Sequence, residues 1–196
     1  LYASMWEHGR RPWQVISGGP GSGLYKSTDA GEHWEKINEG LPKELGKMAI
    51  SVSRANSDKV YALVESDTQK EQGGLFVSND GGANWNRVSK DHRLISRAWY
   101  YIETFADTKD ENTVYVLGAA GLKSADGGKT WTEIRGTHGD YYQLWINPDN
   151  NQNLLISNDG GSAVSFNGGK VWSLQNNQPT AQFYRINVDN LFPYNI

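Results

Sequence analysis

The sequence predicts an all-β fold, a β-propeller built of four-stranded antiparallel blades, and three observations support this prediction. A motif of the form SxDxGxxW recurs along the chain at intervals of 41 to 51 residues. Aromatic residues make up 12% of the chain, and 22 of its 196 residues are glycine. Most intervals also hold four short runs of strand-forming residues. Four short strands per repeat at this period are typical of propeller blades, and tight glycine turns are typical of their connections.

The repeated motif occurs in three full copies and one altered copy. The copies are STDAGEHW (27–34), SNDGGANW (78–85), SADGGKTW (124–131) and SFNGGKVW (165–172). Ser and Asp side chains can accept the N–H groups of a tight turn, Gly can adopt a positive φ, and Trp can cover the turn. We therefore expect a structural role for the motif residues Ser27, Asp29, Gly31, Trp34, Ser78, Asp80, Gly82, Trp85, Ser124, Asp126, Gly128, Trp131, Ser165, Asn167, Gly169 and Trp172.

Strand-forming runs flank each motif and place it at the tip of a β-hairpin. The preceding runs are GLYKS, GGLFVS, GLKS and GSAVS, and the following runs are HWEKI, NWNRVS, TWTEI and VWSLQ. Two further strand candidates precede the later hairpins: KMAISVS with KVYALVE, AWYYIETFA with TVYVLG, and YYQLWIN with NLLIS. The predicted blades therefore cover approximately residues 1–40, 46–90, 97–136 and 140–176 of a single domain spanning 1–196.

The two ends of the chain predict an incomplete ring. The first blade lacks a candidate for its innermost strand, and QFYRINVD, near the start of residues 181–196, has the pattern of an innermost strand without the rest of its blade. This strand either closes the first blade of a four-bladed ring or starts a further blade. We favour the second alternative, a segment of a larger propeller. The remaining blades of the same protein would then cover its exposed surfaces.

The repeated motif resembles the Asp-box of BNR-repeat propellers, which occur in sialidases, xyloglucanase-type glycoside hydrolases, sortilin-type receptor domains and photosystem II assembly factor-like proteins. Much of the chain is also similar to the bacterial sortilin-like, or glycosyl-hydrolase-like, BNR-repeat proteins. The stretches that carry this likeness are LYASMWEHGRRPWQVISGGPGSGLYKSTDAG, RAWYY, HGDYYQLWINPDN, SNDGG and NNQPTAQFYRINVDNLFPY. That family has an HGDHH-like stretch where this chain has Tyr141 and Tyr142, a departure that weakens any metal or acid–base role for this stretch.

The resemblance implies an exported bacterial protein, extracellular or periplasmic, that is glycan-active or binds glycans. Any enzymatic activity would be of the glycoside hydrolase type. Two alternatives stay open: a non-enzymatic, sortilin-like propeller that binds a protein or peptide, and a purely structural scaffold segment. Fold alone does not decide between them.

Charge and composition argue against several other classes of function. The net charge is −3, and the longest run of basic residues is the pair Arg10 and Arg11, so nucleic acid is not an expected partner. No apolar run approaches the roughly 20 residues of a membrane helix, so no membrane partner is expected. The chain has no cysteine, and its four histidines show no HxH or HExxH spacing. We therefore expect no metal and no cofactor.

The ligand site is expected at the end of the blades opposite to the motif hairpins. The motif joins the third and fourth strands of a blade, whereas propeller ligands bind where the other set of loops converges. These loops are expected at 7–22, 65–72, 91–101, 137–142, 157–161 and 176–185. Flat aromatic faces beside hydrogen-bonding groups suit sugar rings or peptide side chains. The ligand-binding candidates in these loops are Trp13, Arg97, Trp99, Tyr100, His138, Tyr141 and Tyr184.

Two carboxylates in these loops are candidates for catalysis. Glycoside hydrolysis usually needs a pair of carboxyl groups roughly 5 to 9.5 Å apart. Asp140 and Asp159 belong to loops of the same predicted blade and form the candidate pair. Within SNDGG, however, Asp159 also fits a plain glycine turn in which its carboxylate bonds its own backbone.

Overall fold

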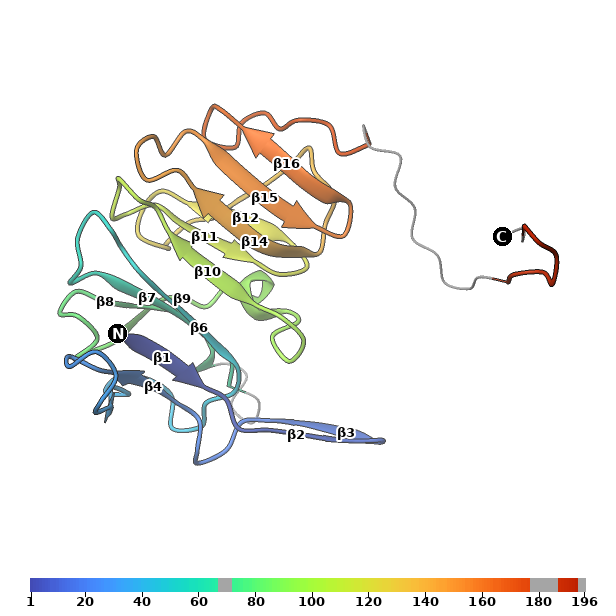
Figure 1. Ribbon diagram of the computed structural model, residues 1–196. Coiled ribbons are helices and arrows are strands. Elements are labelled where there is room, and N and C mark those ends of the chain that lie inside the picture. Colours follow the sequence, from blue (N-terminus) through green and yellow to red (C-terminus); the bar gives the residue numbers. More distant parts are fainter. Residues whose placement is uncertain (67–71, 177–186, 194–196) are drawn as a thin grey trace.

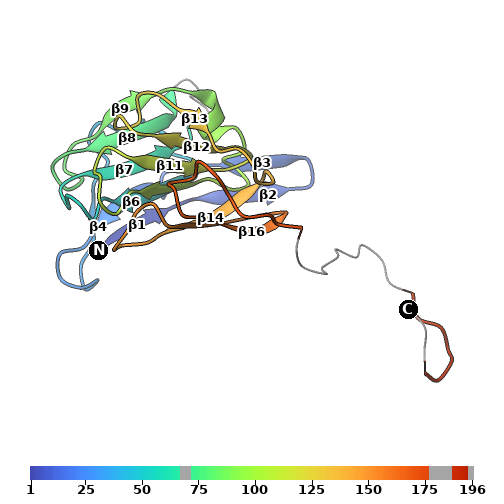
Figure 2. The ribbon, with the colours of Figure 1, turned by 90° about the horizontal axis from the view of Figure 1, so that it is seen from above.

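The computed structural model describes residues 1–66, 72–176 and 187–193, and this part of the chain is an all-β fold with one short 3-10 helix. Four antiparallel sheets follow one another in chain order (Figure 1), and a fifth, two-stranded sheet projects from the first of them. Figure 2 shows the sheets lying over one another as layers. The arrangement confirms the predicted all-β propeller fold.

The first two sheets differ in one strand. The second sheet has the full four-stranded order β6-β7-β8-β9, whereas the first, within the described residues, has the three-stranded order β1-β4-β5 without an innermost strand. The strands of the first sheet are β1 (Tyr2–Met5), β4 (Gly23–Lys26) and β5 (Glu35–Lys36). Those of the second are β6 (Met48–Val52), β7 (Val60–Val64), β8 (Gly74–Ser78) and β9 (Asn86–Ser89).

The third sheet repeats the four-stranded order of the second, as β10-β11-β12-β13. The fourth sheet has the first three strands of that order, β14-β15-β16. The strands are β10 (Glu103–Ala106), β11 (Val114–Leu117), β12 (Gly121–Ser124), β13 (Thr132–Glu133), β14 (Tyr141–Ile146), β15 (Leu154–Asn158) and β16 (Gly161–Ser165). The innermost strands β6, β10 and β14 follow one another side by side.

The prediction of a fourth strand at VWSLQ is wrong, because this run makes too few backbone bonds with the sheet. Ser173 N–H donates to the carbonyl of Val164, and Ser173 Oγ accepts the Val164 N–H, but Leu174 then turns its side chain to solvent. The predicted strand QFYRINVD lies mostly outside the described residues, and its last residues, 187–189, form no strand.

The prediction of a strand over AWYY, the first four residues of AWYYIETFA, is also wrong. Asp91 Oδ1 accepts the Arg93 N–H at 3.0 Å and caps the 3-10 helix η2 (His92–Ile95). Leu94 and Ala98 are buried against the core, so the chain turns over them, and β10 starts only at Glu103. As a result, residues 97–101 form a turn rather than a strand.

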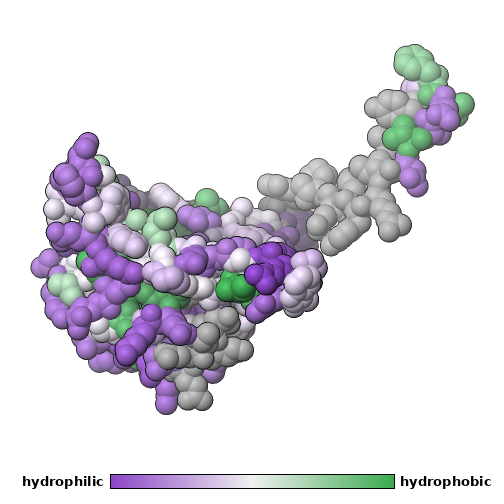
Figure 3. Space-filling model, turned by 90° about the horizontal axis from the view of Figure 1, so that it is seen from below, coloured by the Kyte–Doolittle hydropathy of each residue, from purple (hydrophilic) through white to green (hydrophobic). Residues whose placement is uncertain are grey.

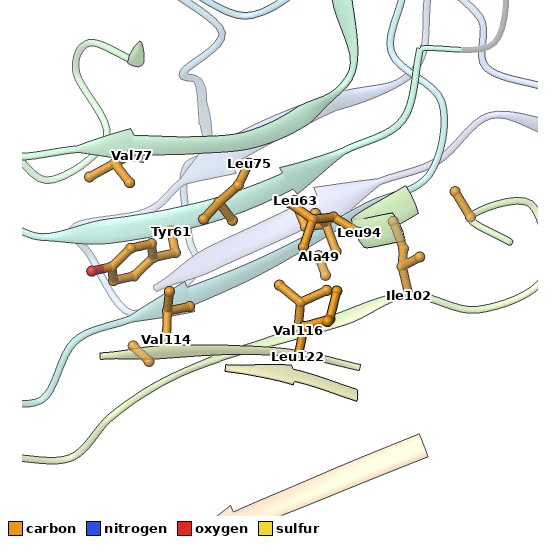
Figure 4. Packing of buried hydrophobic residues seen from close by; sticks show 12 residues of the cluster. Ala49, Tyr61, Leu63, Leu75, Val77, Leu94, Ile102, Val114, Val116 and Leu122 are labelled. Atoms are coloured by element: carbon orange, nitrogen blue, oxygen red, sulfur yellow. The ribbon is translucent and has the colours of Figure 1, made fainter. Parts of the chain in front are cut away.

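The core consists of three apolar layers, one between each pair of adjacent sheets. Side chains alternate in direction along a strand, so a strand between two sheets is buried on both faces. In β7, Tyr61 and Leu63 face the third sheet, where they meet Val114 and Val116 (Figure 4), while Ala62 faces the first sheet. This two-sided burial explains why β7, β8 and β11 contain few polar residues.

The four repeated turns share one pattern of hydrogen bonds. In each turn the serine hydroxyl donates to Oδ1 of the Asp or Asn two residues later and accepts the N–H of the motif glycine. The same Oδ1 accepts a backbone N–H four residues further on, at 2.9 to 3.0 Å. The motif glycines have φ between 85° and 103°, where a side chain would be strained. Oδ1 of Asn167 makes the same two hydrogen bonds as Oδ1 of the three aspartates.

Acid is expected to weaken these turns, except the one that contains Asn167. Hydrogen bonds, the largest from the Ser78 hydroxyl, hold the pKa of Asp80 at about 2, below its ordinary value of 3.8. A carboxyl whose pKa falls on folding stabilises the fold above pH 3.8, and that stabilisation is lost as the pH falls through about 2. We therefore expect Asp80→Asn to reduce the loss of Tm between these two pH values.

At neutral pH the two substitutions of Asp80 should separate. Asp80→Asn is expected to keep the turn, since Asn167 already makes these bonds, whereas Asp80→Ala removes them and should lower the Tm by about 3 °C. Equal Tm values for both variants across the pH range would show that the bonds do not stabilise the turn.

Candidate functional site

Side chains from all four of the layered sheets gather at the end opposite to the repeated turns. This end holds the segments that lead into β6, β10 and β14, because each repeated turn lies at the far end of the third strand. We call this group of side chains the mouth. Its members are Trp6, Lys47, Glu65, Arg97, Trp99, Tyr100, Tyr101, Asp140, Tyr142 and Asp159.

Asp140 is bound by two donors from the turn at residues 97–101. Arg97 Nη1 lies 3.1 Å from Asp140 Oδ1, and the Tyr101 hydroxyl donates to the same oxygen. The Arg97 guanidinium also lies over the rings of Tyr100 and Tyr101, 5.3 and 5.6 Å from their centroids. Asp140 has a φ of 56°, a left-handed conformation that aspartate tolerates better than most residues. The turn therefore fixes the position of the carboxylate.

Four aromatic rings form a continuous row across the mouth. The centroid distances are 6.1 Å from Trp99 to Tyr100, 5.0 Å from Tyr100 to Tyr101 and 5.2 Å from Tyr101 to Tyr142. Trp99, Tyr100 and Tyr142 are all more than 40% exposed, whereas Tyr101 is buried beneath them. Such a row offers flat apolar faces to a ligand that lies along it.

Asp159 lies next to Asp140, so the structure brings the predicted pair together. The Asp159 N–H donates to the Asp140 carbonyl at 3.2 Å, and the Tyr142 hydroxyl donates to Asp159 Oδ1 at 2.6 Å. This hydrogen bond raises the pKa of Tyr142 to about 12, and burial together with Asp140 raises the pKa of Tyr101 further. Both phenols therefore stay protonated at neutral pH and donate to the two carboxylates.

A second set of contacts ties the mouth to the first and second sheets. Lys47 Nζ donates to the Tyr100 carbonyl at 2.9 Å and lies 5.4 Å from the centroid of the Trp6 ring. Glu65 is buried and accepts the Ser17 hydroxyl at 2.5 Å and the Lys47 N–H at 3.0 Å. Ser17 in turn accepts the Trp6 indole N–H at 3.0 Å. These bonds hold Lys47 and Trp6 beside the aromatic row.

Tyr141 was predicted to bind ligand, and the structure places it elsewhere. It is only 3% exposed, packs with Leu117 and Leu144, and pairs its hydroxyl with Thr137 Oγ1 at 2.7 Å. Because neighbouring residues of a strand face opposite sides, the first Tyr of the pair enters the core and Tyr142 faces the mouth. The prediction for Tyr141 as a stacking surface is therefore wrong.

The other ligand candidates lie apart from the aromatic row or outside the described residues. Trp13 lies between β2 (His8–Arg11) and β3 (Gln14–Ser17), a hairpin that replaces the predicted loop, and its side chain is exposed. His138 lines a shallow cavity with Gly160 and Gln175, and its N–H donates to Gln175 Oε1 at 2.8 Å. Tyr184 lies outside the described residues.

Several mouth residues were absent from the ligand-binding candidates. Tyr101 and Tyr142 lie inside the predicted loops, but sequence alone does not indicate which tyrosines of these loops face outward. Lys47 was assigned to the strand KMAISVS, and it lies just before β6. Glu103, the first residue of β10, has a pKa raised by burial and partly lowered again by Lys47. The predicted strand AWYYIETFA places Glu103 in the middle of a strand, whereas β10 begins at Glu103.

The described residues contain neither a metal-binding group nor a membrane-spanning helix. No group of three or more His, Asp or Glu is placed to hold a metal ion in this part of the chain. Within the same ranges, no helix has the length and apolar character needed to span a membrane.

Layered antiparallel sheets of three or four strands, with innermost strands that lie side by side, define a segment of a β-propeller, with a polar and aromatic mouth at one end. No protein-family model matches the chain. A xyloglucanase from Paenibacillus sp is 32% identical to it over 80 residues, which is 41% of this chain and 7% of that protein.

Solved structures share the fold at low sequence identity. The GH74 enzyme of Niastella koreensis has a TM-score of 0.57 and 20% identity, and the match covers 87% of this chain and 23% of that one. YCF48 bound to D1 peptide has a TM-score of 0.54 and 16% identity over 81% of this chain and 49% of that one. The chain therefore spans less than half the length of each of these proteins.

Proposed function

We propose that the mouth binds a glycan chain and that the protein is a glycan-active or glycan-binding propeller. The observation that carries this proposal is the exposed aromatic row beside two carboxylates fixed by tyrosine hydroxyls. A sugar ring has an apolar face that packs on an aromatic ring and hydroxyls at its edge that donate to carboxylates. The similarity to a xyloglucanase supports a polysaccharide as the ligand.

Within this proposal Asp140 and Asp159 bind sugar hydroxyls and, in a hydrolase, one of them is the base. A hydrolase also needs a proton donor with a raised pKa. Glu103 fits that part, because it lies at the mouth end of β10 and burial raises its pKa. Both carboxylates of the pair, in contrast, already accept hydrogen bonds from protonated groups.

We further propose that this propeller belongs to the Asp-box class and works outside the cytoplasm. The shared bonds of the four repeated turns support the class, because Ser, Gly and the Asp or Asn between them make the same hydrogen bonds in each copy. An extracellular polysaccharide does not cross a membrane, so a protein that binds one has to be exported. Detection of the full-length protein in the periplasm or the medium after cell fractionation tests the location, and an exclusively cytoplasmic protein contradicts it.

Further blades of the same protein are proposed to cover the free face of the fourth sheet. Trp145 of β14 lies opposite Leu155 of β15, and both side chains are largely exposed. On the second sheet the residues that face the next sheet, Tyr61 and Leu63, are completely buried. Figure 3 shows a different face, seen from below, on which hydrophilic residues predominate over a few apolar patches. An exposed apolar sheet face is typical of a packing surface.

Binding and hydrolysis assays on a panel of polysaccharides and their oligosaccharides test the proposed function. We expect Asp140→Asn and Asp159→Asn each to weaken binding of a xyloglucan oligosaccharide by about tenfold, since each loses a charged acceptor. Any hydrolysis by the protein should fall by at least about 100-fold in the variant that lacks the base. Asp149→Asn is the control, because Asp149 is an exposed turn residue that precedes β15, away from the mouth.

A polypeptide ligand is the second candidate, and the fold of YCF48 bound to D1 peptide is the observation that favours it. Binding to peptides but to no member of the glycan panel would support this second function. Unchanged glycan binding in both Asp140→Asn and Asp159→Asn would remove these residues from the site.

A further inference from the structure

A second candidate site lies between the third and fourth sheets, at the end that carries the repeated turns. A cavity of about 820 Å³ opens there, lined by Tyr115 of β11, Lys123 of β12 and Trp172 at the end of the fourth repeated turn. The mouth lies at the other end of the same strands, so the two sites do not overlap. None of the residues used so far for glycan binding lines this cavity.

Trp172 has a buried indole N–H without a partner in the described residues. The matching tryptophans of the second and third repeats are bonded to the preceding sheet. Trp85 Nε1 donates to the Ile37 carbonyl at 2.7 Å, and Trp131 Nε1 donates to Ser89 Oγ at 3.2 Å. Trp172 lines the cavity and is 8% exposed, and its N–H has no acceptor among the described residues. A buried donor without an acceptor is costly unless a ligand or water satisfies it.

Tyr115 shows the same difference from its equivalent. Tyr61 is the second residue of β7, as Tyr115 is of β11, and its hydroxyl donates to the Glu111 carbonyl in the next sheet at 2.5 Å. The Tyr115 hydroxyl is buried and has no partner in the described part of the chain. The tyrosine hydroxyl and the indole N–H therefore have acceptors between the second and third sheets, but their equivalents between the third and fourth sheets have none among the described residues.

Positive charge lies beside these two open groups. Lys123 Nζ lies 5.2 Å from the centroid of the Tyr115 ring and donates to the Gly168 carbonyl at 3.0 Å. Burial lowers the pKa of Lys123, Asp107 and Asp110 partly oppose this effect, and Lys170 adds to it. A further negative charge beside Lys123 would stabilise its protonated form.

The acidic residues that line the cavity already have partners. Asp126 accepts bonds from its own turn, including the Thr130 hydroxyl at 2.6 Å, and Glu133 pairs with Arg135 at 3.7 Å. The side-chain groups without a partner are therefore an indole N–H and a hydroxyl, while the Lys123 ammonium, which donates to the Gly168 carbonyl, has further N–H groups to donate.

We propose that this cavity binds a small oxyanion, a carboxylate or phosphate group, through Trp172, Tyr115 and Lys123. The anion accepts the indole N–H and the tyrosine hydroxyl, which have no other acceptor, and neutralises the lysine. The fold leaves these donors open only at the junction between the third and fourth sheets, among the described residues. The site is independent of the glycan proposal, because it uses other residues at the opposite end of the sheets.

Proton–nitrogen NMR spectra of the eight tryptophan indoles, assigned by Trp→Phe variants, provide the test. Inorganic phosphate, acetate and neutral glucose are titrated separately. We expect a saturable shift of the Trp172 indole with phosphate, acetate or both, no shift of Trp85, and no response to glucose. A response to one anion alone identifies the class of group that the site takes.

Three variants make the test specific. Trp172→Phe, Tyr115→Phe and Lys123→Met should each weaken anion binding by at least tenfold, as followed by isothermal titration calorimetry. Tyr61→Phe is the matched control, because it removes a hydroxyl at the other junction and should leave anion affinity unchanged. Tyr115→Phe should keep the wild-type Tm, since its hydroxyl has no protein partner to lose. The proposal is overturned if no anion gives a saturable shift, or if the three variants bind the anion as the wild type does.

Discussion

Replacing Trp99 with alanine is expected to weaken the binding of a xyloglucan oligosaccharide by roughly 30-fold, since a tryptophan that is covered by a bound ligand is worth about 2 kcal/mol. Trp99 is 46% exposed at the end of the aromatic row, so a sugar can cover its ring. Isothermal titration calorimetry with the purified protein measures the change.

The control for Trp99→Ala is Trp34→Ala. Trp34 is similarly exposed, at 42%, but it belongs to a repeated turn at the other end of the sheets. We expect Trp34→Ala to leave the affinity unchanged. An equal loss of affinity in both variants would mean that the sugar does not bind along the aromatic row.

Shortening Leu75 to alanine is expected to lower the free energy of unfolding by about 3 kcal/mol, because the substitution leaves a cavity in the core. Leu75 is completely buried between the second and third sheets, where it packs with Leu63 and Leu122 (Figure 4). Urea unfolding, followed by tryptophan fluorescence, measures the difference. A loss below about 1 kcal/mol would show that the two sheets do not pack as described.

Leu155→Ala provides the comparison for Leu75→Ala. Leu155 also lies in a strand, but it is 42% exposed on the free face of the fourth sheet. We expect a much smaller loss of stability in this chain. A loss as large as that of Leu75→Ala would contradict the exposure of this face.

Most of the fold could be predicted from the repeat, because the same hairpin is encoded four times. The pattern SxDxGxxW fixes a turn through local bonds between Ser, Asp and Gly, and such bonds depend little on distant parts of the chain. The strands between these turns followed from their β-branched and aromatic residues. The failures occurred where local pattern and tertiary packing disagree. AWYY has the composition of a strand, yet burial of Leu94 and Ala98 bends these residues into a turn that precedes β10.

The candidate site could be located from the sequence, but its geometry could not be worked out. Knowing that the repeated turns occupy one end of each sheet was sufficient to place the site at the other end. The pairing of Asp140 with Arg97, in contrast, joins residues 43 positions apart and depends on the turn that replaced the predicted strand. The choice between Tyr141 and Tyr142 depends on the register of β14 against β15, which includes an irregularity between Tyr141 and Gln143.

The two ends of the sheets differ in how their polar groups are paired. At the mouth the third sheet supplies Arg97 and Tyr101, and the fourth supplies Asp140, so a ligand there is held by residues that the packing of two sheets brings together. At the other end the repeated turns satisfy most of their own polar groups locally, except beside Trp172 and Tyr115. Substitutions at one end should therefore leave binding at the other end unchanged, which separates failure of the anion site from failure of the glycan site.

Glycan binding at the mouth is tested most directly by the NMR response of the tryptophan indoles to an added xyloglucan oligosaccharide. We expect saturable shifts of Trp99 and Trp6, which belong to the mouth, and no shift of Trp34 at the opposite end. Glycan binding at the mouth would be contradicted if Trp99 and Trp6 did not respond at millimolar sugar, or if the shifts were confined to Trp34 and Trp172.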